Sequence, residues 1–204
     1  MTATDKEKQT VDYYDREAAN WASSHKGYEE KSYWEGEMAK FHELLPSGKV
    51  LEIGFGTGKD ALALIALGYD YTGTDASEGL LKIARRRNPN AKFEYMAVHD
   101  LEFDDGEFDG FWTAATLLHI PKDRIDGALV SIKKVIKHGG IGFISMKSGV
   151  GERTDPETGR WFSYYSQDEF NDVLKRNDFE IINKATRQGE KDLWLVYFVK
   201  TPKV

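Results

Sequence analysis

The stretch "KVLEIGFGTGKD", residues 49–60, decides the fold of this chain. An apolar run interrupted by one acid, Glu52, leads into glycines on alternate positions, Gly54, Gly56 and Gly58. Glycine loses more conformational freedom on folding than any other residue, so this density indicates a turn with unusual backbone angles or a close approach to a ligand. The apolar run predicts a buried strand, and the residues after the turn have the spacing of a helix.

From the strand before this turn onward, predicted strands and helices alternate along the chain. This alternation predicts βαβ units with right-handed crossovers and helices on both faces of a parallel sheet. The expected fold class is therefore α/β, a Rossmann-like three-layer sandwich. The expected strands are 49–54, 69–75, 91–98, 106–115 and 139–147, and the helices between them are 58–68, 77–87 with Ser77 as cap, and 121–137 with Pro121 in its first turn.

The two ends of the chain depart from this alternation. Apolar spacing over 5–45 predicts two helices before the first strand. Near the end of the chain, a helix is followed by two strands with only Gly189 and Glu190 between them, which predicts a hairpin. This hairpin should add an antiparallel strand to a mostly parallel sheet. One domain over 1–204 is expected, with parts 1–46, 47–147, 148–166 and 167–204.

The composition is that of an ordinary globular protein. The formal net charge of −6 disfavours nucleic acid as a partner, because phosphate contacts need a basic face. The one basic cluster, Arg85 to Arg87, falls at the expected end of a helix, where cations complement the helix dipole. The chain has no cysteine and its histidines lack metal-ligand spacing, so no bound metal is expected. Without a membrane-length apolar run or a secretory leader, a cytoplasmic protein is favoured.

Three classes of ligand use a glycine-rich turn between a strand and a helix. The nucleoside-triphosphate loop needs Gly-Lys followed by Ser or Thr, whereas here Lys59 is followed by Asp60. The dinucleotide fingerprint needs a third glycine where this chain has Lys59. The third class carries an acid just before the turn, and Glu52 fits that class.

Two further acids follow the next two strands. Asp75 ends the second strand, where a carboxylate can accept hydrogen bonds from both hydroxyls of a ribose. Asp100 follows the third strand, where it can contact an adenine amino group. Taken singly, each could be a capping or solvated acid. Because the carboxyl ends of parallel strands meet at one edge of the sheet, the three acids in this order indicate a nucleoside site.

With these residues in place, the chain resembles the class I S-adenosylmethionine-dependent methyltransferases over roughly residues 10–200, above all the small ones that act on small molecules. The resemblance implies a seven-stranded sheet with one antiparallel strand. It also implies S-adenosyl-L-methionine as cofactor and S-adenosyl-L-homocysteine as product. It rests on "VLEIGFGTG", "YTGTDAS", "VHDLEF", "FDGFWTAATLLHIP" and "LVSIKKVIKHGGIGFISM".

The resemblance implies which residues would hold the cofactor. Glu52 would lie near its methionine part, the glycine turn beside the methionyl and ribose groups, and Asp75 at the ribose. The other positions would flank the adenine or line the methyl-donor pocket. The expected set is Tyr14, Glu52, Gly54, Gly56, Gly58, Asp75, Ala76, Asp100, Leu101 and Ala115.

Residues 1–46 are expected to form a lid. "DYYDREAANW" resembles the opening of many small methyltransferases, in which an aromatic pair closes over the cofactor, so Tyr13 or Tyr14 would make that contact. The alternative is that Tyr14 and Trp21 are only core aromatics on an apolar helix face. A lid would also exclude water from the site.

Two segments are candidates for the acceptor side. His119 in "TLLHIP" is the expected catalytic base, because imidazole titrates near neutrality, although it could instead only bond backbone groups. A tertiary amine or soft sulfur acceptor would need no base. In the long segment 148–166, cations and aromatics indicate an acceptor with an anionic part and a flat or apolar part, unless Trp161 and Phe162 merely pack on the sheet edge. The expected acceptor-binding residues are Tyr13, Lys147, Arg160, Trp161 and Tyr164.

The sequence leaves three functions open. The first is a methyltransferase for a small-molecule acceptor. The second is the same site serving RNA, such as a modified tRNA base, and the third is a non-catalytic protein that binds S-adenosylmethionine. A nicotinamide oxidoreductase is a distant fourth, given Lys59 in place of the third glycine. A monomer or homodimer without membrane contact is expected.

Overall fold

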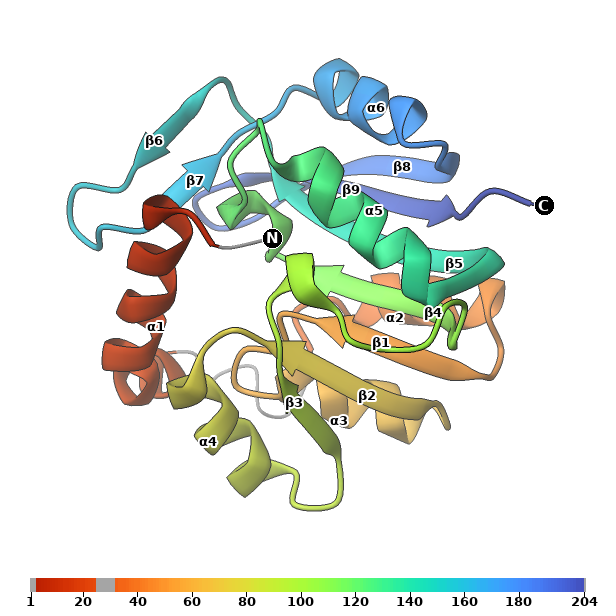
Figure 1. Ribbon diagram of the computed structural model, residues 1–204, viewed down its shortest axis with the longest axis horizontal. Helices are drawn as coiled ribbons and strands as arrows, with labels where there is room; N and C mark the ends of the chain where they lie inside the picture. The colour runs from red at the N-terminus through yellow and green to blue at the C-terminus, as the bar shows by residue number, and fades with distance from the viewer. Residues whose placement is uncertain (1–2, 25–31, 204) are drawn as a thin grey trace.

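The computed structural model describes residues 3–24 and 32–203 (Figure 1). Residues 1–2 and 25–31, which belong to the expected lid, and residue 204 lie outside the described part. The elements in chain order are α1 (Asp5–Ser24), α2 (Glu35–Leu44), β1 (Lys49–Ile53), α3 (Lys59–Ala66), β2 (Asp70–Asp75), α4 (Glu78–Arg87), β3 (Lys92–Tyr95), η2 (Val98–Asp100), β4 (Phe108–Ala114), η3 (Leu117–His119), α5 (Ile125–Val135), β5 (Ile136–Lys147), β6 (Glu152–Thr154), β7 (Trp161–Ser163), α6 (Gln167–Arg176), β8 (Glu180–Gln188) and β9 (Leu193–Lys200).

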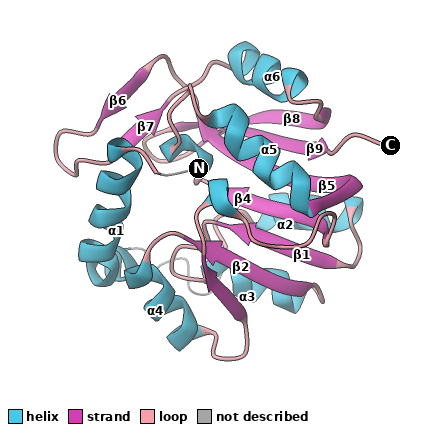
Figure 2. Ribbon diagram, in the orientation of Figure 1, coloured by secondary structure: helices cyan, strands magenta, loops and turns pink. Residues whose placement is uncertain are grey.

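A seven-stranded sheet in the order β3-β2-β1-β4-β5-β9-β8 runs through the molecule (Figure 2). Strands β3, β2, β1, β4 and β5 pair in parallel, while β9 is antiparallel to both β5 and β8. The expected fold class is confirmed, including the antiparallel C-terminal hairpin. The chain reverses its direction of travel across the sheet between β1 and β4, and open parallel sheets bind ligands beyond the carboxyl ends at such a switch point.

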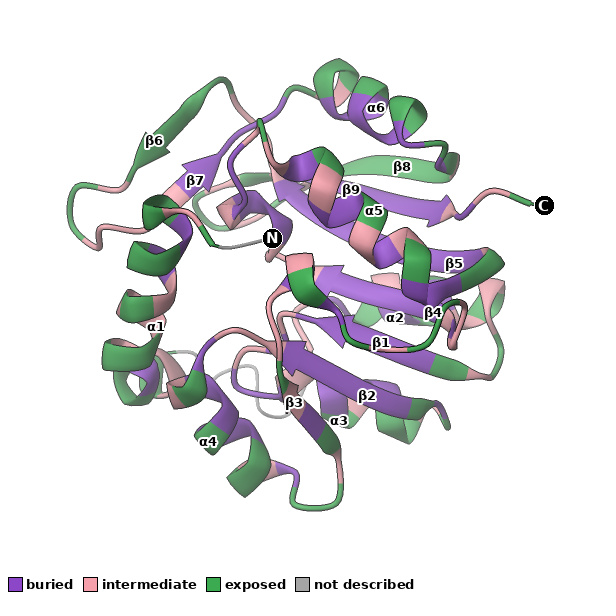
Figure 3. Cartoon of the chain, viewed as in Figure 1, coloured by how far each residue is buried: buried purple, intermediate pink, exposed green. Residues whose placement is uncertain are grey.

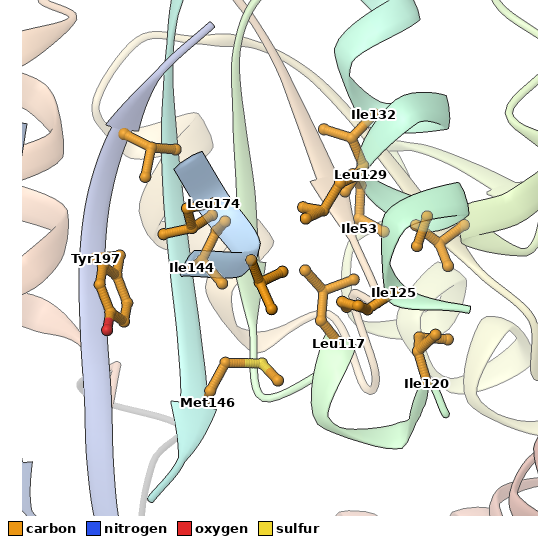
Figure 4. Packing of buried hydrophobic residues seen from close by; sticks show 14 of the residues in the cluster. Ile53, Leu117, Ile120, Ile125, Leu129, Ile132, Ile144, Met146, Leu174 and Tyr197 are labelled. Atoms are coloured by element: carbon orange, nitrogen blue, oxygen red, sulfur yellow. The ribbon is translucent and has the colours of Figure 1, made fainter. Parts of the chain in front are cut away.

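Helices cover both faces of this sheet and complete the three layers. On one face α5 and α6 pack through a core cluster that includes Leu129, Ile132 and Leu174 (Figure 4). On the other face α2 and α3 pack through a second cluster, in which Phe41 and Leu64 are fully buried. Figure 3 shows burial concentrated in the central strands and on the inner faces of these helices. The two cores hold the strand ends in fixed positions.

Helix α1 belongs to neither layer. It lies across the carboxyl ends of the parallel strands, between β7 and α4, and contacts both (Figure 1). Ala18 of α1 packs with Leu80 and Ile83 of α4 in a small separate cluster. Within the expected lid, α1 is therefore the helix over the sheet edge, whereas α2 is part of a sheet layer.

The structure departs from the predicted elements in several places, and the third strand ends at Tyr95 while residues 136–137, expected in a helix, begin β5. The helix expected from Pro121 begins at Ile125, because 121–124 forms a turn in which Arg124 N–H donates to the Pro121 carbonyl. The C-terminal hairpin turn extends over 189–192 rather than two residues. Segment 148–166 contains the antiparallel pair β6 and β7, and strands this short carry no periodicity that a sequence could reveal.

Candidate active site

A cavity of 310 Å³ lies at the carboxyl ends of the parallel strands, beneath α1. This volume falls at the lower end of the range for small-molecule sites, roughly 300–1,000 Å³. The loops after β1, β2 and β4 contribute to its walls together with η2, η3 and α1. Most of the expected cofactor residues line it, namely Tyr14, Glu52, Gly54, Gly56, Asp75, Ala76, Asp100 and Ala115, as does His119.

The glycine turn has the tight geometry that its composition predicts. Gly54, Gly56 and Gly58 all have positive φ, between 59° and 77°. A Cβ on Gly54 would come within 2.1 Å of Thr116 Oγ1, whereas Gly56 has open space beside it. Gly54 therefore lets the loops after β1 and β4 approach each other, and Gly56 leaves one side of the cavity clear.

Gly58 and Leu101, by contrast, do not line the cavity. Gly58 is the N-cap of α3, and its carbonyl accepts a hydrogen bond from Asn88 Nδ2 at 2.9 Å. A Cβ at this position would come within 2.8 Å of that same nitrogen. Leu101 is buried in the core cluster that carries α5. Both residues support the site from behind.

One side of the cavity is formed by buried and half-buried carboxyl groups. Glu52 accepts a hydrogen bond from the Tyr71 hydroxyl, and burial, reinforced by the nearby charge of Asp60, raises the pKa of Glu52 well above its usual value. Asp60 accepts from Ser32 Oγ at 2.9 Å and from Trp112 Nε1 at 3.0 Å, and burial raises the pKa of Asp60 as well. Clustered buried carboxyls favour a cationic ligand and repel a pyrophosphate.

Asp75, at the end of β2, completes this side. Its carboxylate accepts from the backbone N–H groups of Gly56 and Ser77, both at 2.9 Å, and burial raises the pKa of Asp75 to about 6. A carboxylate has about four acceptor sites, so Asp75 retains capacity for the two hydroxyls of a ribose. We call Glu52, Asp60 and Asp75 the acidic wall. Its chemistry fits a positively charged nucleoside.

The opposite side is built around a hydrogen-bonded pair, Tyr14 from α1 and His119 from η3. Tyr14 OH lies 2.9 Å from His119 Nε2, and His119 Nδ1 lies 2.7 Å from the carbonyl oxygen of Trp161. Because a carbonyl only accepts, Nδ1 carries the proton and Nε2 accepts from the tyrosine. Burial, helped by the charges of Arg160 and Lys147, lowers the pKa of His119 to about 3. His119 is therefore neutral near pH 7, with both ring nitrogens engaged.

Arg160, one residue before β7, supports this pair. Its Nη1 donates to Tyr14 OH at 3.0 Å, and its guanidinium lies 5.2 Å from the Trp21 ring centroid and 5.1 Å from that of Phe162. Within the part of the chain that the structure describes, Arg160 makes no ion pair. We call Tyr14, Trp21 and His119, which line the cavity, the aromatic wall; Arg160 lies behind it.

The expected acceptor-binding residues lie behind the aromatic wall and do not line the cavity. Lys147 Nζ pairs with Asp192 at 2.9 Å, so its charge is compensated. Among these residues Arg160 is the cation without an ion pair in the described part of the chain. The full set of expected acceptor-binding residues outside the cavity lining is Tyr13, Lys147, Arg160, Trp161 and Tyr164.

Sequence reasoning missed several residues of the cavity. For Asp60 a signal was present, since it lies two positions after Gly58, but this residue was used only to exclude a triphosphate loop. The others had no local signal, because their place depends on how α1 and the segment before α2 fold over the sheet edge. They are Glu7, Thr10, Ser32, Tyr33 and Trp34.

Residues 3–24 and 32–203 contain neither a metal-binding cluster nor a membrane-spanning helix. No group of three His, Asp or Glu side chains in these ranges could hold a metal ion. None of the described helices has both the length and the apolar character to cross a membrane.

Comparison with known proteins identifies the family. A family model described as a methyltransferase domain matches residues 50–140. An uncharacterised protein of Methanocaldococcus jannaschii is 31% identical over 176 residues, which are 81% of this chain and 80% of that protein. The chain belongs to the class I S-adenosylmethionine-dependent methyltransferases. This confirms the resemblance predicted from the sequence, and S-adenosylmethionine is the cofactor of that family.

Other members of the family carry specific names. A demethylmenaquinone methyltransferase of Clavibacter sepedonicus is 33% identical over 95 residues, 45% of this chain and 38% of that protein. The chain thus spans well under two thirds of the length of the first curated relatives it matches, 38% and 53%. The solved 1,6-didemethyltoxoflavin-N1-methyltransferase of Burkholderia thailandensis, with bound 1,6-didemethyltoxoflavin and S-adenosylhomocysteine, has a TM-score of 0.79 at 20% identity, covering 100% of this chain and 92% of its own. At that identity the likeness shows the fold.

Proposed function

We propose that this chain transfers a methyl group from S-adenosylmethionine to a small-molecule acceptor. The observation that carries the proposal is a single cavity between an acidic wall and an aromatic wall. When bound, the cofactor supplies an activated methyl group on a sulfonium centre, whose positive charge suits the acidic wall. Asp75 would hold the ribose, Asp100 would face the adenine, and Glu52 with Asp60 would face the methionine part.

The chain's own contribution would be positioning and exclusion of water. Tyr14 and Trp21 of α1 line the cavity over the strand ends, where they would keep solvent from the reacting groups. Ala115 holds an uncommon φ of 55°, fixed in part by its N–H donating to Ser145 Oγ at 2.9 Å. Strained backbone of this kind often occurs at functional sites. Holding two reactants aligned can alone supply about 7–11 kcal/mol of a barrier.

Catalysis by His119 stays a prediction, and the geometry favours a positioning role over a base. Its Nε2 lone pair is engaged by Tyr14, and an imidazole with a pKa of about 3 is a poor proton acceptor near neutrality. In this arrangement the Tyr14 hydroxyl would be the group that touches the acceptor, and His119 would fix its orientation. Acceptors that need no deprotonation fit this site without a catalytic base.

Charge and shape support an acceptor with an anionic group and a flat part. Arg160 makes no ion pair in the described residues and lies behind the aromatic wall, while the acidic wall would repel an anion. Tyr33 and Trp34 add aromatic surface to the cavity. The relative named for demethylmenaquinone supports a small-molecule acceptor.

The two alternatives are an RNA acceptor and a non-catalytic binding role. The net charge of −6 disfavours RNA. In the basic cluster at the end of α4, Arg85 Nη2 donates to the Phe93 carbonyl at 2.7 Å and Arg87 Nη1 to Thr57 Oγ1 at 2.8 Å, so both have partners within the chain. A binding protein without activity would have the same cavity. The cytoplasmic location and the monomeric or homodimeric state stay predictions.

One experiment separates these possibilities. Calorimetry measures binding of S-adenosylmethionine and S-adenosylhomocysteine, and the methyl-labelled cofactor is then incubated with a pool of small metabolites and, in parallel, with bulk tRNA. We expect binding, followed by label in small molecules that an anion exchanger retains. Label in tRNA favours the RNA alternative, and binding without transfer favours the non-catalytic one. Absence of binding contradicts the proposal.

A further inference from the structure

Glu7, near the start of α1, is a buried carboxylate with several partners. Its Oε1 lies 2.9 Å from His99 Nε2, and its Oε2 lies 2.6 Å from Arg124 Nη1. Thr4 also donates to Oε2, from its N–H at 2.8 Å and its hydroxyl at 2.7 Å. Although burial acts in the opposite direction, the bonds from His99 and Thr4 lower the pKa of Glu7 to about 2. Glu7 is therefore ionised and held at the centre of a buried polar cluster.

One partner of Glu7 lies beside the expected adenine site, and the other lies at the start of α5. His99 lies in η2 next to Asp100, the residue expected at the adenine, and Arg124 is the N-cap of α5. The side chains of Glu7, His99 and Arg124 are 8%, 4% and 10% exposed. His99 belongs to η2 and Arg124 to the start of α5, so Glu7 anchors α1 to these two elements.

The next turns of α1 make contacts on the acceptor side. Thr10 Oγ1 accepts from the Trp161 N–H at 2.9 Å, and Tyr14 bonds His119 and Arg160 as described above. Residues 7, 10 and 14 follow the i, i+3, i+7 spacing of a single helix face. None of the hydrogen bonds and ion pairs described above joins Glu7 directly to β7 or η3, so helix α1 is the direct link between Glu7 and the contacts of Thr10 and Tyr14.

We propose that Glu7 is a positioning residue for the acceptor side of the site. By anchoring the start of α1 to η2 and α5, it holds Thr10 and Tyr14 in register with β7 and η3. Helix α1 thereby couples η2, beside the expected adenine site, to the aromatic wall. The function of this coupling rests on the proposed methyl transfer, but the coupling itself is measurable without it.

The substitution Glu7→Gln isolates this effect. The amide keeps the shape of the side chain but loses the charge, and it leaves His99 and Arg124 facing a weaker acceptor in a buried place. Asp12→Asn is the matched control, since it removes an exposed carboxylate from the same helix. Glu7→Asp keeps the carboxylate with a shorter reach.

Hydrogen exchange of the Trp161 amide, followed by NMR, is the measurement, because that N–H is bonded to Thr10 and not to Glu7. We expect exchange at least tenfold faster in Glu7→Gln, unchanged in Asp12→Asn and intermediate in Glu7→Asp. The Phe143 amide in central strand β5 reports global unfolding and should change less. A Trp161 rate that is unchanged, or that changes only in step with Phe143, overturns the proposal.

Calorimetry with S-adenosylhomocysteine on the same proteins keeps the two proposals apart. We expect its affinity to fall at least fivefold in Glu7→Gln and to be unchanged in Asp12→Asn. If the wild type does not bind, the proposed function fails, while the exchange rates still decide the role of Glu7. If the wild type binds and Glu7→Gln binds equally well, coupling to the cofactor side is refuted.

Discussion

The acidic wall and the aromatic wall face the same cavity and are built in opposite ways. Glu52, Asp60 and Asp75 lie close together in the sequence, on two adjacent strand ends and the start of one helix. Tyr14 and His119 are separated by 105 positions, and Tyr14 and Arg160 by 146. The backbone of the sheet fixes the first wall, whereas the second exists only while α1 is docked. The proposed cofactor side therefore depends mainly on the sheet, and the proposed acceptor side depends also on the docking of α1.

Burial acts on both walls by favouring the neutral form of the titratable groups. It raises the pKa of Asp75 to about 6 and lowers the pKa of His119 to about 3. A cationic ligand would restore the charge of the acidic wall, because it compensates a carboxylate. The aromatic wall has its cation, Arg160, behind it. The two walls therefore favour ligands of opposite charge, and four predictions test this comparison.

Loss of Asp75 should have the largest effect. In Asp75→Ala the ribose hydroxyls lose their acceptor, and the N–H groups of Gly56 and Ser77 lose theirs. Hydrogen bonds to charged groups contribute about 1.5–3 kcal/mol each, so the affinity for S-adenosylhomocysteine should fall at least ~100-fold. Calorimetry measures this, with Asp70→Ala at the exposed start of β2 as control. Unchanged affinity would contradict the proposal that the acidic wall binds the cofactor.

Gly54 joins the two walls, and its substitution should come next. A Cβ there would sit 2.1 Å from Thr116 Oγ1 on a backbone with φ of 77°, so Gly54→Ala should lower the free energy of unfolding by about 2 kcal/mol. Urea unfolding measures this. Gly36→Ala on α2, with nothing within 4 Å, should instead stabilise by up to about 1 kcal/mol. Equal effects of the two substitutions would show that Gly54 makes no close approach.

Tyr13 and Tyr14 are adjacent tyrosines with different surroundings. Tyr14→Phe leaves Arg160 and His119 without their shared hydroxyl and should cost about 1–1.5 kcal/mol of stability. Methyl transfer to the acceptor found in the screen should fall roughly tenfold by the same reasoning. Tyr13→Phe should do neither, since its hydroxyl makes no hydrogen bond among the described residues. Urea unfolding and methyl-transfer rates are measured for both variants. Equal effects of the two substitutions would contradict the role of the Tyr14 hydroxyl in the aromatic wall.

The dependence of stability on pH should show the smallest effect. The folded pKa of His119, about 3, lies below the unfolded value of about 6.5, so the unfolded chain binds more protons between them and stability falls as pH is lowered. Asp75 acts in the opposite direction, because its folded pKa of about 6 lies above the unfolded value near 3.9. Between pH 4 and 6, approximately, the two contributions oppose each other in the wild type.

The variant His119→Gln separates them. Between pH 6 and pH 5 it should lose about 1 kcal/mol less stability than the wild type, close to the limit of ~1.4 kcal/mol per pH unit for one group. Urea unfolding at several pH values in this interval is the measurement. Parallel curves for the two proteins would mean that His119 titrates normally in the folded state.

The same contrast explains how much the sequence could predict. Strand alternation, the glycine turn and the acids Glu52 and Asp75 are local patterns, and the sheet places them by rules that hold for any open parallel sheet. Asp60 lies two positions after Gly58, yet its direction into the cavity depends on Ser32 and Trp112, which bond it from distant segments. The hairpin of β6 and β7 and the contacts of Glu7 had no periodic signal at all.

The sequence by itself determined the fold class and the cofactor side, because strand ends and a glycine turn are fixed by residues close together in the chain. Only the tertiary structure decided that α1 is the helix over the cavity, that His119 is held neutral behind Tyr14, and that Arg160 forms no ion pair with the described residues. These properties arise from burial and from contacts between residues over a hundred positions apart. Such contacts depend on how the whole chain packs, which no local pattern records.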